Sequence, residues 1–248
     1  GAGTFRIYHN NSNTATGTLA FGEGISPGDL TLVKEGNHLF VAVGGDDSSS
    51  GGVWLHNWFS GSRYQPATLR FATADEPFSG TLLDLAPLQI HGTSANNTLY
   101  GTSGADLLAG GKGNDYLKGG LGDDLYRFAA GDGIDRIDNS DPKGIDRIAF
   151  AASVDPDTLA FYRNGRNLVL DYGSGDRITI NNHFAGANYA IDEVHLADGR
   201  YLGGADINQL IEQMSAYAVA EGIGLSSIED VKKNPELMTM VAGSWQAA

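Results

Sequence analysis

Apolar residues recur in phase with glycine through the middle of the chain, between Gly92 and Arg127. Four nine-residue units follow one another there without a gap, and they read GTSANNTLY, GTSGADLLA, GGKGNDYLK and GGLGDDLYR. A large apolar residue occupies the eighth position of each unit, and aspartate or asparagine occupies the sixth. A strict period of this length predicts a repeat architecture in which each unit forms a glycine-rich turn and a short strand.

The regions on either side of these units resemble each other, over residues 21–71 and 150–196, once a four-residue insertion near residues 44–52 is allowed. Residues 21–30 match 150–159 in this alignment. Alternating apolar runs separated by Gly, Asn and Asp predict short strands joined by turns. Each copy is therefore expected to form a small β module.

The last part of the chain changes to a helical pattern. Apolar residues recur there on one helix face, at Ile207, Leu210, Ile211, Met214 and Ala218. Asp206 is the expected N-cap of this helix and Gly222 its end. Ser226 with Glu229 predicts a capping box for a second helix, and Asn234 before a proline predicts the start of a third.

Composition and charge narrow the classes of partner. The chain has 22 Asp and 8 Glu against 16 Lys plus Arg, for a net charge of −14. This charge argues against nucleic acid or an anionic membrane surface as partners and favours cations. The chain has no cysteine, which excludes disulfides and thiolate metal sites. No apolar run approaches the roughly 18 residues of a membrane span, and the start without Met predicts a fragment of a longer protein.

The aspartates of the repeat predict a cation site. In a stacked coil, units one and three lie above each other, as do units two and four, so that carboxylates and turn carbonyls from two layers face one gap. An empty gap would hold like charges and unpaired carbonyls, which is costly. Oxygen ligands without His or Cys favour Ca²⁺ over Zn²⁺, and the adjustable geometry of the turns suits Ca²⁺ better than Mg²⁺.

The units at 110–127 resemble the nonapeptide of the repeats-in-toxin (RTX) family, a calcium-binding parallel β-helix repeat. Residues 126–137 are similar to the closing segment of RTX arrays, and the flanking modules resemble the haemolysin-type calcium-binding-related domain. The stretch from Ile207 to Trp245 is similar to type I secretion signals. The resemblance implies the C-terminal portion of a secreted, extracellular RTX protein that passes through the type I secretion machinery.

The resemblance also implies a ligand set. Asp106, Asp115 and Asp124 are the expected side-chain ligands, and Asn97 is a weaker one because it lacks charge. Asp132 and Asp135 would supply carboxylates between unit three and the closing segment. Backbone carbonyls would come from the turn glycines, at Gly101, Gly104, Gly110, Gly111, Gly113, Gly119 and Gly120. About three calcium ions are expected, and none in the first module, because Phe5 stands there at the equivalent of Asp135.

The predicted fold is mainly β: a calcium-binding parallel β-roll flanked by two related small β modules, with a short α-helical C-terminal tail. The predicted boundaries are 1–90 for the first module, 91–137 for the nonapeptide roll, 138–205 for the second module and 206–248 for the tail with its secretion signal. The modules would cap the ends of the roll.

The leading hypothesis is a non-enzymatic module that folds on binding calcium outside the cell and supports type I secretion and folding of a larger toxin-like or hydrolase-like protein. No serine nucleophile elbow is expected, although a catalytic part could lie upstream. The alternative is an adhesin-type region that binds an unidentified surface glycan or protein.

Aromatic residues of the first module distinguish the two hypotheses. They are Trp54, Trp58, Phe59 and Tyr64, and they form either a ligand platform or a core. The core is favoured, because Phe184 and Tyr189 recur at equivalent positions of the second module. An exposed pair of tryptophans at 54 and 58 would favour the adhesin, and burial of both would count against it. The insertion at residues 46–50 is expected to be a solvated loop.

Overall fold

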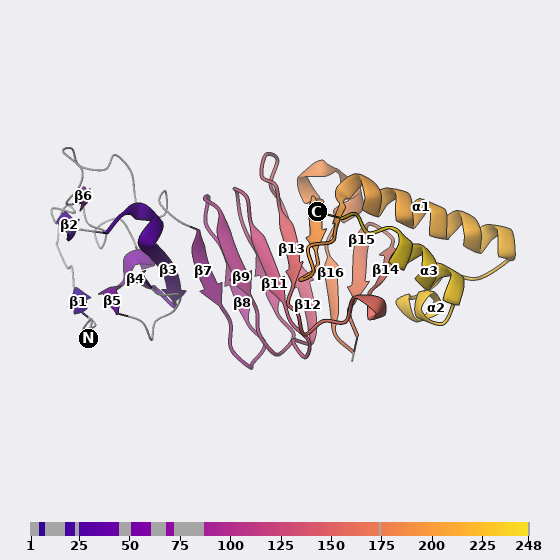
Figure 1. Ribbon diagram of the computed structural model, residues 1–248, viewed down its shortest axis with the longest axis horizontal. Helices are drawn as coiled ribbons and strands as arrows, with labels where there is room; N and C mark the ends of the chain where they lie inside the picture. The colour runs from indigo at the N-terminus through magenta and orange to yellow at the C-terminus, as the bar shows by residue number, and fades with distance from the viewer. Residues whose placement is uncertain are drawn as a thin grey trace. The chain divides into compact units, whose positions relative to one another are not determined.

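The computed structural model describes residues 5–7, 18–22, 25–44, 51–60, 68–71, 87–173 and 175–247. The chain divides into two compact units, Gly1–His91 and Gly92–Ala248. Strands dominate both units, as the sequence predicts, and the α-helices of the described residues lie at the end of the second (Figure 1).

The first unit is built around an antiparallel sheet. Its strands are β1 (Phe5–Ile7), β2 (Thr18–Phe21), β3 (Leu30–Glu35), β4 (His38–Val43), β5 (Gly52–Leu55), β6 (Thr68–Phe71) and β7 (Leu88–His91). Strands β3, β4 and β5 are antiparallel neighbours, β1 pairs in parallel with β5, and β7 pairs in parallel with β3. Strands β2 and β6 form a separate parallel pair.

The second unit contains two facing sheets. Its strands are β8 (Thr98–Tyr100), β9 (Asp106–Ala109), β10 (Tyr116–Lys118), β11 (Leu125–Phe128), β12 (Ile134–Ile137), β13 (Arg147–Phe150), β14 (Ala160–Asn164), β15 (Asn167–Asp171), β16 (Arg177–Ile180), β17 (Glu193–His195) and β18 (Tyr201–Gly203). One sheet has the order β9-β11-β13-β17-β18, and the other β14-β15-β16-β12-β10-β8.

Consecutive nonapeptides send their strands alternately to the two sheets. Leu99 of unit one is therefore in parallel register with Leu117 of unit three, and Leu108 of unit two with Tyr126 of unit four. The eighth-position side chains of units two to four are fully buried between the sheets, because this position points inward from every strand. The narrow core and the i to i+2 stacking are those of a β-roll.

The two modules share their unusual backbone positions. Asn57 and Asn182, which correspond in the sequence alignment, are the non-glycine residues with positive φ among the described residues, at 59° and 57°. The Asn57 amide donates to His38 Nδ1 at 2.9 Å, and the Asn182 amide donates to Asn167 Oδ1 at 2.8 Å. A strained conformation kept at the same place in both copies supports the internal duplication.

The aromatic residues of the first module divide between core and surface. Trp58 is 2% exposed, whereas Trp54 is half-buried and packs on Phe40 with ring centroids 4.9 Å apart. Phe59 is also half-buried. Tyr64 and residues 46–50 lie outside the described residues. Trp58 therefore lies in the core, and its burial removes one of the two tryptophans that the adhesin hypothesis would need at the surface.

Three helices follow β18: α1 (Gly204–Glu221), α2 (Ile228–Lys232) and α3 (Pro235–Gly243). The predicted apolar face of α1 is buried, and the helix ends at Gly222 with φ 65°. Asn234 caps α3 as predicted, with proline in the first turn. Among the described residues, none of the helices is long and apolar enough to cross a membrane.

Two of the predicted helix N-caps are wrong, the first by three residues and the second by one. Helix α1 begins at Gly204, and Asp206 is its third residue, whose carboxylate accepts the Gly203 amide at 3.0 Å. The reason is that β18 ends at Gly203 and leads directly into the helix. The capping box of α2 uses Ser227 and Asp230 instead of Ser226 and Glu229.

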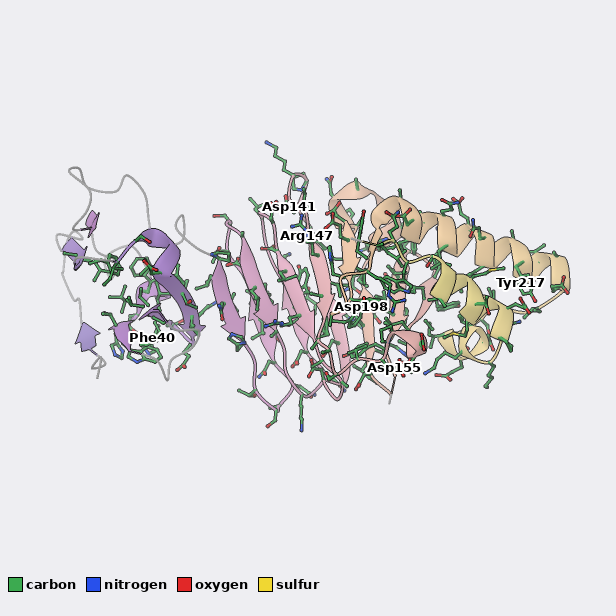
Figure 2. All side chains as sticks on the ribbon, in the orientation of Figure 1. Phe40, Asp141, Arg147, Asp155, Asp198 and Tyr217 are labelled. Carbon is green, nitrogen blue, oxygen red and sulfur yellow. The ribbon has the colours of Figure 1, made fainter. Side chains whose placement is uncertain are left out.

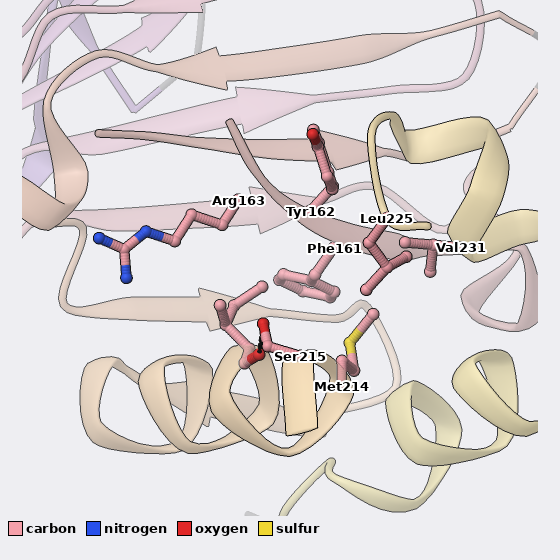
Figure 3. A pocket seen from close by; sticks show the side chains of 8 residues that line it. Phe161, Tyr162, Arg163, Met214, Ser215, Leu225 and Val231 are labelled. Atoms are coloured by element: carbon pink, nitrogen blue, oxygen red, sulfur yellow. Dashed lines mark hydrogen bonds between the residues drawn. The ribbon is translucent and has the colours of Figure 1, made fainter. Parts of the chain in front are cut away.

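The helices of the tail cover the β14 end of the second unit (Figure 1). Phe161 of β14 lies beside Met214 of α1 and Val231 of α2, around a cavity of about 120 Å³ (Figure 3). A buried carboxylate fixes this contact, because Asp171 Oδ1 accepts from Lys232 Nζ at 2.7 Å. The Arg177 guanidinium lies 3.4 Å from the other oxygen of Asp171.

Substitution of Lys232 by alanine should destabilise the docked tail. Asp171 is 1% exposed and would keep only its longer contacts, with Arg177 at 3.4 Å and with the Gly173 amide at 3.2 Å. Loss of a hydrogen bond to a buried charge costs on the order of 1.5–3 kcal/mol. The free energy of unfolding, from urea denaturation in calcium, should fall by this amount, whereas Lys233→Ala at the adjacent exposed position should leave it unchanged. Equal stability of both variants would show that the ion pair does not hold the tail.

Candidate metal centre

Buried aspartates form two ladders through the second unit, each running from layer to layer. In the first ladder, Asp115 Oδ1 accepts the Asn97 amide at 2.6 Å and Asp135 Oδ1 accepts the Asp115 amide at 2.9 Å. The first ladder stops there, because Ile178 is the register partner of Asp135 in the next strand.

The second ladder is longer. It contains Asp106, Asp124, Asp146 and Asp192. Asp124 Oδ1 accepts the Asp106 amide and Asp146 Oδ1 accepts the Asp124 amide, both at 3.0 Å. Asp192 Oδ2 then accepts the Asp146 amide at 2.8 Å. One oxygen of each acceptor carboxylate therefore ties two layers together.

The other oxygen is the distinctive feature of these carboxylates. Oδ2 of Asp115, of Asp124 and of Asp135 is buried and has no hydrogen-bond partner. The three residues are between 1% and 3% exposed. A buried acceptor without a partner is costly, and a buried carboxylate without a counter-charge is more so.

The first glycine of each unit makes room for the stacking. A Cβ on Gly101 would overlap the carbonyl oxygen of Gly119 in the layer above, and a Cβ on Gly110 or Gly119 would overlap the aspartate of its own unit. Gly111, Gly113 and Gly120 have φ of 79°, 125° and 119°, and Gly104 lies under the next layer's Gly122. The predicted glycines thus bring backbone carbonyls close to the buried carboxylates.

Burial raises the pKa of the ladder carboxyls. The pKa of Asp124 rises to about 8, mainly through desolvation, with contributions from the nearby charges of Asp106 and Asp146. Desolvation likewise raises the pKa of Asp135 to about 7, and it raises the pKa values of Asp115 and Asp146. The folded chain alone therefore opposes ionisation of its own ladders.

The outer candidates differ from the ladder carboxylates. Asn97 Oδ1 accepts the Thr93 amide at 2.6 Å, within its own turn. Asp132 is half-buried, and its Oδ2 accepts the Ala129 amide at 2.8 Å. Asp132 is close enough to Asp135 for its charge to raise the pKa of that carboxyl.

Several buried polar residues of the centre were missed from the sequence: Asn139, Asp141, Asp146, Asp176 and Asp192, of which all but Asp192 are at most 5% exposed. A signal for Asp146 exists, because Gly-Ile-Asp-Arg-Ile occurs at 133–137 and again at 144–148. Asp176 accepts the amides of Gly131 and Gly133 from the closing turn. No comparable pattern marks the four residues other than Asp146.

The donor set fits a hard cation. Among the described residues, no three carboxylate or imidazole side chains converge on one point. A cation here would therefore take carboxylate oxygens from stacked layers together with turn carbonyls. The unpartnered oxygens of Asp115, Asp124 and Asp135 are the observation that favours it, because Ca²⁺ accepts six to eight oxygen ligands in adjustable geometry.

The first unit contains one serine with the sequence spacing of a nucleophile elbow. The spacing Gly-x-Ser-x-Gly does occur, at residues 24–28. In the structure Ser26 precedes a short 3₁₀ turn, and its hydroxyl donates to Asp29 at 2.7 Å. A nucleophile elbow needs a strand-to-helix turn. Asp155, which aligns with Ser26 in the second module, also caps a turn, so this position has a structural role.

Comparison with known families agrees with this geometry. Residues 91–126 match the RTX calcium-binding nonapeptide repeat. The central repeats are RTX nonapeptides. Residues 167–206, in the second module, match the haemolysin-type calcium binding protein related domain. The RTX array is a calcium-binding type of repeat. The first match lies within the predicted roll at 91–137, and the second overlaps the predicted second module at 138–205.

The likeness to solved structures is weak. The chain is similar to the extracellular lipase LipA from Serratia marcescens, with 18% sequence identity and a TM-score of 0.30. The match covers 71% of this chain and 31% of the lipase chain. A likeness of this level carries no argument about activity. No curated protein matches the chain.

Alanine at Gly101 should destabilise the roll. The added methyl would overlap a backbone carbonyl of the next layer, which cannot rotate away, and overpacking of this kind costs about 1–3 kcal/mol. The thermal midpoint in calcium should fall. Gly224→Ala is the control, because a Cβ there meets nothing within 4 Å. An unchanged midpoint for Gly101→Ala would contradict the close stacking.

Acid should stabilise the calcium-free fold. The pKa values of Asp124 and Asp135 are raised to about 8 and about 7 in the folded chain, so between these values and the ordinary carboxyl pKa the folded state binds more protons than the unfolded state. Stability without calcium is then lost as the pH rises through 7 to 8.

Chemical denaturation in chelator between about pH 5 and 8 should show this fall, on the order of 1 kcal/mol or more. In saturating calcium the dependence should reverse, because protons compete with the cation for the same oxygens. A calcium-free stability that rises with pH would contradict the burial of these carboxylates.

Proposed function

We propose that this chain is a calcium-dependent folding module of a larger, extracellular protein exported by type I secretion. The observation that carries the proposal is the set of buried carboxylate oxygens without partners in the stacked turns, at Asp115, Asp124 and Asp135. Bound Ca²⁺ would supply positive charge and oxygen coordination at these atoms. The ladder carboxylates with the turn glycines would hold about three ions.

Calcium concentration would act as the folding switch. A site with a Kd near 0.1 mM in about 1 mM calcium stabilises the folded state by about 1.4 kcal/mol. Three such sites would contribute about 4 kcal/mol, which is comparable to the net stability of a small domain. At micromolar calcium the gain disappears, whereas the repulsion between stacked aspartates remains. The roll would then stay unfolded inside the cell and fold outside it.

The parts of the chain would have separate roles. Residues 1–90 and 138–205 would cap the two ends of the nonapeptide roll at 91–137, and residues 206–248 would carry the secretion signal. The buried face of α1 and the Asp171–Lys232 pair support a tail that docks onto the second module after folding. An exposed signal would therefore exist only in the unfolded chain. The module itself would be non-enzymatic, and the activity of the larger protein would lie elsewhere.

The alternative is an adhesin-type region that binds a surface glycan or protein through the first module. The half-buried Trp54 supports it, since its ring packs on Phe40 and still reaches the surface. Burial of Trp58 counts against it, because a platform needs aromatic faces in solvent.

Far-ultraviolet circular dichroism during a calcium titration tests the folding switch. We expect a cooperative gain of β signal between chelator and about 10 mM calcium, and no gain with Mg²⁺, which demands stricter octahedral geometry. Asp115→Asn should move the midpoint to calcium concentrations about tenfold higher. Asp157→Asn is the control, because this exposed carboxylate lies outside the ladders. A fully folded spectrum in chelator that calcium does not change would overturn the proposal.

A further inference from the structure

We propose that a further Ca²⁺ site lies beyond the nonapeptide array, between the turn of unit four and the turn at residues 139–146, with Asp124, Asp146 and Asn139 as side-chain ligands. The proposal rests on the calcium binding proposed for the array and extends it from Asp124 to Asn139 and Asp146, which lie outside both family matches, at 91–126 and 167–206.

Residues 141–149 form a degenerate repeat unit. Strand β13 pairs in parallel with β11, with Leu125 opposite Arg147 and Tyr126 opposite Ile148. Gly144, Asp146 and Ile148 therefore occupy the fourth, sixth and eighth positions of a nonapeptide. A Cβ on Gly144 would overlap the Gly122 carbonyl oxygen in the layer below, so this turn stacks on unit four as closely as the units stack on one another.

Asp141 stands at the first position of this degenerate unit, where the four nonapeptides have glycine. Its Oδ2 accepts the Gly122 amide at 2.6 Å, and its Oδ1 accepts the Lys143 amide at 2.8 Å. Both oxygens are thus engaged in holding the turn on the layer below. Asp141 is labelled in Figure 2, among the side chains of the stacked strands. Asp141 contributes negative charge to this layer, but both of its oxygens already accept hydrogen bonds.

Asn139 supplies a side-chain oxygen that has no hydrogen-bond partner. Asn139 is 1% exposed, and its Nδ2 donates to Asp146 Oδ2 and to the Ala190 carbonyl, both at 2.7 Å. These two acceptors fix the orientation of the amide, because the opposite orientation would set Oδ1 against two other oxygens. Oδ1 of Asn139 is left buried without a hydrogen-bond partner. An unpartnered buried oxygen of this kind needs an explanation.

Asp146 connects Asp124 with Asn139. Asp146 is bonded to both candidate neighbours, to the Asp124 amide through Oδ1 at 3.0 Å and to Asn139 through Oδ2 at 2.7 Å. Asp124 contributes a second buried oxygen without a partner, Oδ2. Among the ion pairs of the described residues, none involves Asp124 or Asp146. Two buried carboxylates and one amide oxygen, without a basic side chain, are ligands that suit Ca²⁺.

The number of calcium ions bound per chain tests the site. We would measure it by atomic emission after equilibrium dialysis of the full chain, for the wild type and for Asp146→Asn. This variant keeps the shape of the side chain and removes its charge. We expect one ion fewer than in the wild type.

Asp123→Asn is the matched control. Asp123 lies in the same turn as Asp124 and has the same charge, but its side chain is exposed, and its Oδ1 accepts the Ile145 amide, which asparagine can also do. This variant should bind as many ions as the wild type. An unchanged ion count in Asp146→Asn would overturn the extra site and leave the array intact, whereas a wild type that binds no calcium would overturn the proposed function together with this site.

A crystal structure of the wild type grown in calcium gives a second test that does not depend on the variant folding. We expect an anomalous difference peak about 2.3–2.6 Å from oxygens of Asp124 and Asn139. Ordered calcium in the array and no peak between these two residues would exclude the site.

Discussion

The structure depends on carboxylates stacked above carboxylates inside a narrow roll. Each ladder aspartate uses one oxygen to accept an amide from the adjacent layer, so the same contacts that align the layers also bring like charges together. Glycine makes this approach possible, because a methyl group at Gly101 would already overlap the next layer. The stacking is therefore favourable only when the charge is neutralised by protons or by a cation.

This constraint explains why the second unit combines a nonapeptide array with a module that has a conventional core. Each nonapeptide buries at most one large apolar side chain between the sheets, which gives each layer little hydrophobic stabilisation. The second module and its tail have a conventional core, with Phe161 and Leu168 fully buried and α1 and α2 packed over β14. Once the chain is outside the cell, this module would give the folding of the charge-limited array a starting point. The duplicated first module supplies strands of the same kind, as the matching positive φ of Asn57 and Asn182 indicates.

The periodic parts of this structure were predictable, and the irregular parts were not. A period of nine with glycine first and an apolar residue eighth leads directly to the pairing of Leu108 with Tyr126. The hydrogen bond from the Asp106 amide to Asp124 spans 18 residues, which is two repeat units. The next bond of the same ladder, from Asp124 to Asp146, spans 22 residues, and that from Asp146 to Asp192 spans 46. Insertions between layers hide these partners from any fixed spacing.

Local ambiguity accounts for the smaller errors. Ser226 and Ser227 are adjacent and both precede an acidic residue at capping distance, so only the backbone decides between them. Asn139 stands alone in the sequence, and its buried oxygen becomes visible only when Ala190 and Asp146 are brought beside it. The spacing Gly-x-Ser-x-Gly at residues 24–28 shows the opposite case, in which a motif occurs without the structural context that would give it chemistry.

The most direct test of the central claim is amide hydrogen exchange, followed residue by residue in chelator and in millimolar calcium. The amides of Asp106, Asp115 and Asp124 donate to ladder carboxylates, so they should exchange quickly without calcium and become strongly protected with it, whereas amides of α1 should change less. Equal protection of the ladder amides in both conditions would show that the stacked carboxylates are stable without a cation, and it would contradict the dependence of this fold on calcium.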